Sequence, residues 1–133
     1  MQIFWRDHVR LHSQQGTSER VHARRSYYGK PRYDLLQLTG EDGTAWYARA
    51  LAFFDVQETG RGWRRMALVH WLQPTHVTHV PGTVTYRYWA MRPDVVKVSS
   101  IVRSVRMITS PRRHAGTDEV CFVSLPYGKW RMV

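Results

Sequence analysis

Apolar and polar residues alternate most regularly between Arg32 and Leu72, where three β-type runs follow one another. The runs are Tyr33 to Leu38, Trp46 to Val56 and Met66 to Leu72. An acidic turn with glycine separates the first two runs, and a basic turn with glycine separates the last two. Runs of this composition between such turns are typical of antiparallel strands. The pattern therefore predicts a β-meander that closes near Trp71.

The middle run indicates which side of the predicted sheet faces the core. The residues of one parity are all apolar: Trp46, Ala48, Ala50, Ala52, Phe54 and Val56. The other parity carries Tyr47, Arg49 and Asp55. Because successive side chains of a strand point to opposite faces, we expect the first set to be buried and the second set to face solvent.

The rest of the chain favours short strands over helices. Tyr86 to Trp89 suits a short strand, and Val120 to Leu125 suits a last one. Val95 to Ile108 fits a strand or a helix by pattern, although its valines and isoleucines favour β structure. We expect a mainly β, all-β fold of about seven strands with little helix, bent into a small antiparallel barrel that removes exposed sheet edges.

Residues 1–31 differ from the rest, because they are rich in basic residues and are interrupted by a polar Ser-Gln-Gln-Gly-Thr-Ser segment. We expect a basic N-terminal arm that is irregular and partly ordered, in which Ile3 to Trp5 are apolar enough to dock as an extra strand. Residues 32–133 are expected to form one domain. A length of 133 residues suits a single folded unit, and 43% hydrophobic residues are typical of ordered globular proteins.

The charge points to an anionic partner. The chain has 20 basic and 10 acidic residues, for a net charge of +10, and lysine occurs only at Lys30, Lys97 and Lys129. Arginine makes bidentate contacts to phosphates, which favours a nucleic-acid or nucleosome surface, although biased codon usage also enriches arginine. The candidate phosphate contacts are Arg24, Arg25, Lys30, Arg32, Arg61, Arg64, Arg65, Arg112 and Arg113.

Patterns for catalysis or metal binding are weak. Neither G-x-S-x-G nor a P-loop occurs, and Cys121 lies in an apolar run, where a small buried hydrophobe is expected. His76 and His79 are spaced H-x-x-H in a proline-flanked loop, where solvated histidines are expected more than a zinc site. We therefore expect a binding module and not an enzyme, with no catalytic residue, metal or cofactor. Basic surroundings suit exposed or phosphate-facing roles for further histidines: His8, His12, His22 and His114.

Aromatic residues are the other candidate site. Rings beside a groove enclose cations such as methylated lysine, or stack on the bases of single-stranded nucleic acid. A small barrel also needs large side chains to fill its core, which remains the alternative for each ring. The candidate groove residues are Trp46, Trp71, Tyr86, Tyr88 and Trp89.

Four segments in this order resemble a BAH (bromo-adjacent homology) domain: YDLLQLTGEDGTAWYARALAFFDV, MALVHWL, TYRYWAMRPDVVKVSSIVRSVRMI and VCFVSLPY. The likeness covers residues 32–133 and is nearest to the BAH domain of the largest origin-recognition subunit. The order of motifs also resembles a C-terminal domain of large transposase-like proteins of mobile elements.

The BAH resemblance implies a bent β-barrel that works in the nucleus and binds a nucleosome, a histone tail or DNA. A methyl-lysine cage would include Trp46 and Trp71, with one or two of Tyr86, Tyr88 and Trp89. The chain departs from the family by reading Trp-Leu-Gln-Pro from Trp71, with no acid in sequence beside these aromatics.

Two other functions stay open. A transposase-like origin implies sequence-independent nucleic-acid binding with the aromatics in the core, and a protein–protein scaffold would carry its positive charge through composition alone. Other domains of a larger parent protein are then possible partners. No run of about 18 apolar residues occurs, so no membrane-spanning segment is expected.

Overall fold

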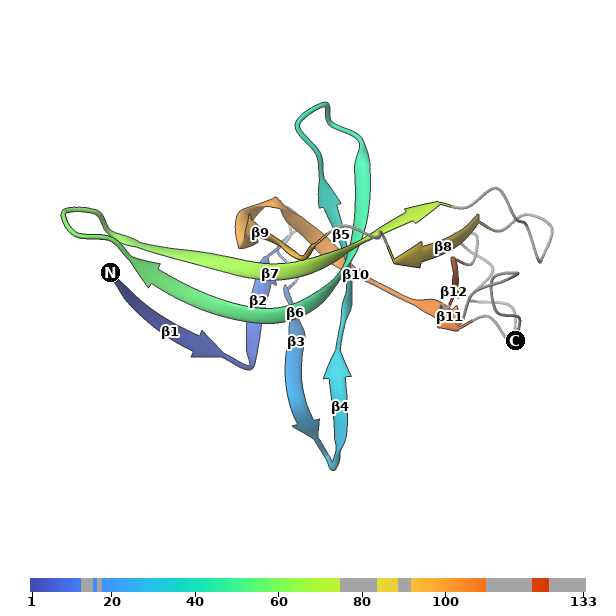
Figure 1. Cartoon of the computed structure of the whole chain (residues 1–133), viewed down its shortest axis with the longest axis horizontal. Helices are drawn as coiled ribbons and strands as arrows, with labels where there is room; N and C mark the ends of the chain where they lie inside the picture. The colour runs from blue at the N-terminus through green and yellow to red at the C-terminus, as the bar shows by residue number, and fades with distance from the viewer. Residues whose placement is uncertain (13–15, 17, 75–83, 89–91, 110–120, 125–133) are drawn as a thin grey trace. The chain divides into compact units, whose positions relative to one another are not determined.

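The computed structural model describes residues 1–12, 16, 18–74, 84–88, 92–109 and 121–124. These residues form antiparallel β structure (Figure 1), in which the one helical segment is a 3-10 turn, Val98–Ser100. The chain divides into two compact units. The first unit comprises Met1–Trp71 and Arg92–Val105, and the second comprises Leu72–Met91 and Arg106–Val133. The expected mainly β class is confirmed.

A large antiparallel sheet forms one layer of the first unit. Strands β5, β6 and β7 are consecutive neighbours, as the predicted meander requires. Strand β10 pairs with β5, β9 pairs with β7, and β1 pairs with the C-terminal half of β6. The prediction that Ile3 to Trp5 add a strand is thus confirmed. The strands are β1 (Gln2–Arg6), β5 (Leu35–Thr39), β6 (Ala45–Gln57), β7 (Trp63–Pro74), β9 (Asp94–Lys97) and β10 (Ile101–Val105).

A second sheet of the first unit comes from the N-terminal segment. Strands β2 (His8–His12), β3 (Ser18–Tyr27) and β4 (Lys30–Tyr33) pair in that order. Residues 1–31 were expected as an irregular arm, but most of the described ones lie in strands β1 to β4. These strands form because apolar residues alternate with polar ones in both β2 and β3. Val9 and Leu11 of β2 and Val21 and Ala23 of β3 are buried, whereas the residues between them are mostly basic.

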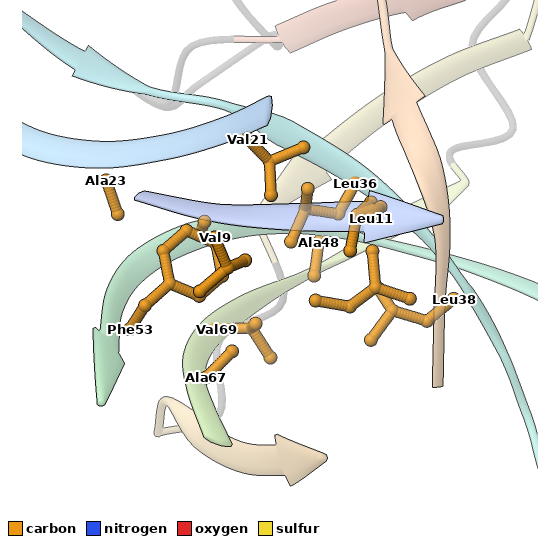
Figure 2. Packing of buried hydrophobic residues seen from close by; sticks show 12 residues of the cluster. Val9, Leu11, Val21, Ala23, Leu36, Leu38, Ala48, Phe53, Ala67 and Val69 are labelled. Carbon is orange, nitrogen blue, oxygen red and sulfur yellow. The ribbon is translucent and has the colours of Figure 1, made fainter. Parts of the chain in front are cut away.

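The core lies between these two sheets (Figure 2). Val9 and Val21 from the second sheet belong to the same buried cluster as Phe53, Ala67 and Val69 from the large sheet. Burying a side chain such as valine or phenylalanine contributes about 1.5–3 kcal/mol, so this shared core holds the N-terminal segment in the fold. The cluster of buried residues is Val9, Leu11, Val21, Ala23, Leu36, Leu38, Ala48, Ala50, Phe53, Ala67, Val69 and Ile101.

Strand β6 changes the side that it presents to the core. Ala48, Ala50 and Val56 are buried, as predicted, but Trp46 is exposed, and Phe53 and Asp55 are buried although they have the opposite parity. Asp55 was predicted to face solvent, and this is wrong, because only 7% of the residue is exposed. The first half of β6 pairs with β5 and the second half with β1, so the two halves meet different neighbours in this long, curved strand (Figure 1).

The second unit is built from short strands. The last residues of β7, Leu72 to Pro74, pair with β8 (Val84–Tyr88), β12 (Cys121–Ser124) pairs with β8, and β11 (Met107–Thr109) pairs with β12. The short strand expected near Tyr86 and the last strand expected at Val120 to Leu125 are confirmed within the described ranges. The ambiguous stretch from Val95 to Ile108 is β structure apart from its 3-10 turn and Arg106, which separates β10 from β11. Pairings between the described strands do not close into a barrel.

Candidate functional site

Basic side chains of β2, β3 and β4 gather on the side of their sheet that faces away from the core. Val9 and Val21 are opposite each other and point into the core. Residues one position away therefore point outward. We call this surface the basic face. Its residues are His8, Arg10, His12, Arg20, His22, Arg24 and Arg32.

Like charges stand directly opposite each other on the basic face. The register of β2 and β3 places Arg10 opposite Arg20, and the register of β3 and β4 places Arg24 opposite Arg32. Directly opposed like charges destabilise a sheet. Arg10 and Arg20 are exposed, so water and counterions reach both guanidinium groups. This arrangement is suited to holding an anion between two strands.

The ring of Tyr27, at the end of β3 next to the hairpin turn, packs against two arginines of the basic face. The guanidinium carbon of Arg32 lies 4.5 Å from the centroid of the Tyr27 ring, and that of Arg24 lies 5.8 Å away. The register of the two strands shifts between Arg24 and Tyr27, which brings this odd-numbered residue to the same face. Cation–π contacts of this kind hold a guanidinium group in place. Tyr27 was not among the sequence-based site residues.

Asp34 anchors one arginine of the basic face. Its carboxylate accepts hydrogen bonds from Arg32 Nε at 3.1 Å and from the backbone N–H of His22 at 2.8 Å. The hydrogen bond to Asp34 is the main reason why the pKa of Arg32 is raised, so the guanidinium stays charged. A second acid, Asp7, lies 3.7 Å from Arg24. The basic face is therefore positive but not free of carboxylates.

His22 lies within this face and is buried, although the sequence predicted an exposed or phosphate-facing position. Its ring meets that of His8 at 5.6 Å and that of Tyr27 at 4.9 Å. Burial, and then the charge of Arg32, lower the pKa of His22, while the charge of Asp34 raises it. Folding thus favours the neutral form of the imidazole.

The predicted phosphate contacts in the turn between β6 and β7 (Arg61) and at the start of β7 (Arg64 and Arg65) are engaged by carboxylates. Glu58 accepts a hydrogen bond from Arg64 at 2.7 Å and lies 3.7 Å from Arg61. Asp55 accepts hydrogen bonds from Arg65 at 2.8 Å and from Arg6. The hydrogen bond from Arg65 is the largest cause of the lowered pKa of Asp55. These arginines have intramolecular partners that compete with a phosphate.

The remaining predicted phosphate contacts divide into two groups. Arg25 and Lys30 are exposed residues of the β3–β4 hairpin and extend the positive charge beyond the basic face. Arg112 and Arg113 lie outside the described residues. The basic face thus contains Arg24 and Arg32, which the sequence indicated, together with Arg10 and Arg20, which it did not.

Trp46 and Trp71 form a second candidate site. Their rings meet edge to face, with centroids 5.6 Å apart. Trp46 is 38% exposed, while Trp71 is partly buried against the core. Trp71 Nε1 donates a hydrogen bond to Asp94 Oδ2 at 3.3 Å. The sequence showed no acid beside the aromatics, but the pairing of β7 with β9 supplies one from 23 residues away.

Trp46 is fixed from its other side by the turn between β5 and β6. Its Nε1 donates a hydrogen bond to Thr44 Oγ1 at 3.0 Å, and that hydroxyl bonds to Asp42 at 2.6 Å. The hydrogen bonds of Thr44 lower the pKa of Asp42. Two rings and a nearby carboxylate are the elements that recognise an organic cation.

Three further groove residues were predicted from the sequence: Tyr86, Tyr88 and Trp89. Tyr86 and Tyr88 belong to β8 of the second unit, where both are half-buried, and Trp89 lies outside the described residues. His76, His79 and His114 also lie outside them. Within the part of the chain that the structure describes, His, Cys, Asp and Glu side chains form no group of three able to hold a metal ion. No helix there is long and apolar enough to span a membrane.

Comparison with known proteins gives no relative: no family model, no curated protein and no solved structure matches the chain.

Proposed function

We propose that the protein is a non-enzymatic, chromatin-associated module of the nucleus that binds nucleic acid through the phosphate backbone, and that its sheets belong to a bent, BAH-like barrel. The observation that carries this proposal is the register that places Arg10 opposite Arg20 on an exposed face. Phosphates bridging the two guanidinium groups relieve their repulsion and accept hydrogen bonds in bidentate geometry.

The distribution of charge supports a nucleic acid as the anion. A net charge of +10 attracts a polyanion at long range, and the basic face offers a row of cations along the strands. Phosphate contacts of this type release counterions, so the affinity falls steeply with salt and depends little on sequence.

The test compares two double variants with the same loss of charge. Arg10→Gln/Arg20→Gln neutralises the basic face, and Arg61→Gln/Arg64→Gln neutralises arginines that Glu58 already engages. Affinity for duplex DNA is measured by fluorescence anisotropy at several salt concentrations. Each lost phosphate contact lowers the slope of log affinity against log salt by about 0.9, so the first variant should lose up to about 1.8 and the second much less.

Equal losses in the two variants would show that only the net charge matters, and the basic face would then have no special role. Absence of nucleic-acid binding by the unaltered protein would end the proposal. Circular dichroism of each variant checks that the sheet structure is kept.

Trp46, Trp71 and Asp94 favour a second candidate function, the reading of a peptide that carries a cationic side chain, such as a methylated histone tail. A trimethyllysine peptide should then bind, with the affinity lowered at least tenfold by Trp46→Ala and by Asp94→Asn. Trp63→Ala is the matched control, because Trp63 is also an exposed tryptophan but lies outside this cluster. Peptide binding that is insensitive to both changes would remove this candidate.

A further inference from the structure

The β3–β4 hairpin ends in a two-residue turn with an aromatic side chain. Tyr27 pairs with Lys30, and the turn residues Tyr28 and Gly29 have φ angles of +51° and +81°. In Figure 1 this hairpin extends away from β5 to β7 of the same unit. Arg25 and Lys30 flank the turn as exposed cations.

Local folding does not account for a tyrosine at this place. Two-residue turns with positive φ at both positions favour Asn, Asp or Gly at the first position, because other side chains are strained there. Tyr28 is the single non-glycine residue with positive φ in the described part of the chain. Its side chain gains little from burial, since the residue is 90% exposed. A strained and exposed aromatic residue is a reason to look for a ligand.

The neighbours of Tyr28 hold it in a defined position. Its ring meets the ring of Tyr27 edge to face, at 4.6 Å and 86°. Tyr27 is itself held by Arg32 and by the buried ring of His22. The exposed Tyr28 ring therefore packs against the Tyr27 ring, which its own neighbours hold in place. Both rings lie beside the cations that the proposed function assigns to phosphate binding.

We infer that Tyr28 stacks on an unpaired base while the basic face and the hairpin cations bind the adjoining phosphates. This inference rests on the proposed function and adds the class of nucleic acid: strands with unpaired nucleotides, of DNA or RNA. In a duplex the faces of the bases are covered by their neighbours, so the ring has no partner there. Stacking depends little on the identity of the base, which fits a module that reads no sequence.

The experiment uses the full chain and two replacements of Tyr28. Tyr28→Asn gives the turn a residue that it favours, so the hairpin is expected to remain folded. Tyr28→Phe keeps an aromatic ring, and Trp63→Ala removes an exposed tryptophan at another turn as a control. The probes are labelled single-stranded DNA and RNA of about 12 nucleotides, the matching DNA duplex, and vesicles with phosphatidylserine.

Tyr28→Asn should weaken single-strand binding about fivefold or more while duplex binding stays the same, and Tyr28→Phe and Trp63→Ala should bind like the unaltered protein. DNA and RNA single strands should respond alike. If Tyr28→Asn changes neither probe or weakens both equally, the stacking role is wrong although phosphate binding stands. If it weakens vesicle binding and spares the single strands, the tip is a membrane contact. If the unaltered protein binds no nucleic acid at all, both this inference and the proposed function fail.

Discussion

The carboxylate of Asp34 accepts a hydrogen bond from the backbone N–H of His22, with 2.8 Å between the two atoms. The backbone of Asp34 is also engaged, because its N–H donates to the His22 carbonyl at 3.0 Å and its carbonyl accepts from Ala50 at 2.9 Å. Asp34 lies between β4 and β5, where the chain passes from one sheet to the other. It therefore joins both layers of the first unit at one point.

Replacing Asp34 should destabilise the fold. Asp34→Ala leaves the His22 N–H and the Arg32 guanidinium without this acceptor, and its side chain is only 16% exposed, so we expect a loss of about 2–3 kcal/mol. Asp34→Asn keeps an acceptor without the charge and should lose less. Urea unfolding measures both, with Glu41→Gln, an exposed turn acid, as the control. An Asp34→Ala variant as stable as the control would contradict the role of this residue.

The carboxylate of Asp55 makes the protein sensitive to acid. Hydrogen bonds from Arg65, and then from Arg6, lower the pKa of Asp55 below 3.8 against the opposing effect of burial. A lowered pKa means that this stabilisation is present above pH 3.8 and is lost as the pH falls through the pKa of the folded state. Asp55→Asn should cost about 2 kcal/mol at neutral pH and much less in strong acid.

Urea unfolding at neutral pH and at about pH 2 checks this expectation. Glu58→Gln is the matched control, because Glu58 also holds two arginines but has a side chain that is 41% exposed. Exposed ion pairs contribute less than about 1 kcal/mol, so its effect should be smaller at neutral pH. Equal effects of the two replacements would contradict the assignment of the acid sensitivity to Asp55.

Hydrophobic alternation predicted the meander, but it did not predict that β6 changes the side that faces the core. Ala48 and Ala50 follow the expected parity, whereas Trp46 is exposed and Phe53 and Asp55 are buried on the other parity. Strand β6 curves between β5 and β1, and the side that faces the core changes along its length. This change depends on residues 2–6, which are far away in the sequence and pair with the second half of β6. Asp55 could enter the interior because Arg6 and Arg65 neutralise its charge there.

The candidate sites depended on similar long-range pairings. Arg24 and Arg32 could be suspected from charge alone, but the pairing that aligns Arg10 with Arg20 requires the register of two strands. Trp46 and Trp71 were predicted as partners and do meet, while the carboxylate of Asp94 comes from β9. No sequence pattern indicated Tyr28, because its proposed role is inferred from its positive φ angle and from its exposure to solvent.

The buried ring of His22 should make stability depend on pH in the mildly acidic range. Burial, and then Arg32, lower the pKa of His22 below 6.5. Folding therefore releases a proton from this ring when the pH lies between the folded and unfolded values, and stability should fall as the pH decreases below 6.5. An NMR titration should give His22 a pKa below 6.5. His22→Phe keeps a ring against Tyr27 and should flatten this part of the profile, whereas an unchanged profile would contradict the assignment.

Gly40 has no side chain, and the indole ring of Trp46 occupies the place where a Cβ atom would be. A Cβ atom added at Gly40 would stand 2.6 Å from Trp46 Cδ1 and closer still to Nε1, so Gly40→Ala must push the indole ring away. Trp46 is 38% exposed, so its ring can move outward, and we expect a loss of about 1 kcal/mol together with loss of the hydrogen bond to Thr44.

Gly40→Ala also separates the two candidate functions, because it disturbs the contact of Trp46 with Trp71 and leaves the basic face alone. If the tryptophan pair binds a cationic peptide, that affinity should fall, while nucleic-acid binding stays at the level of the unaltered protein. Gly62→Ala is the control, since no atom lies within 4 Å of its added Cβ. Tryptophan fluorescence should shift towards longer wavelength for Gly40→Ala only, and an unshifted spectrum would mean that the ring does not pack on Gly40 in solution.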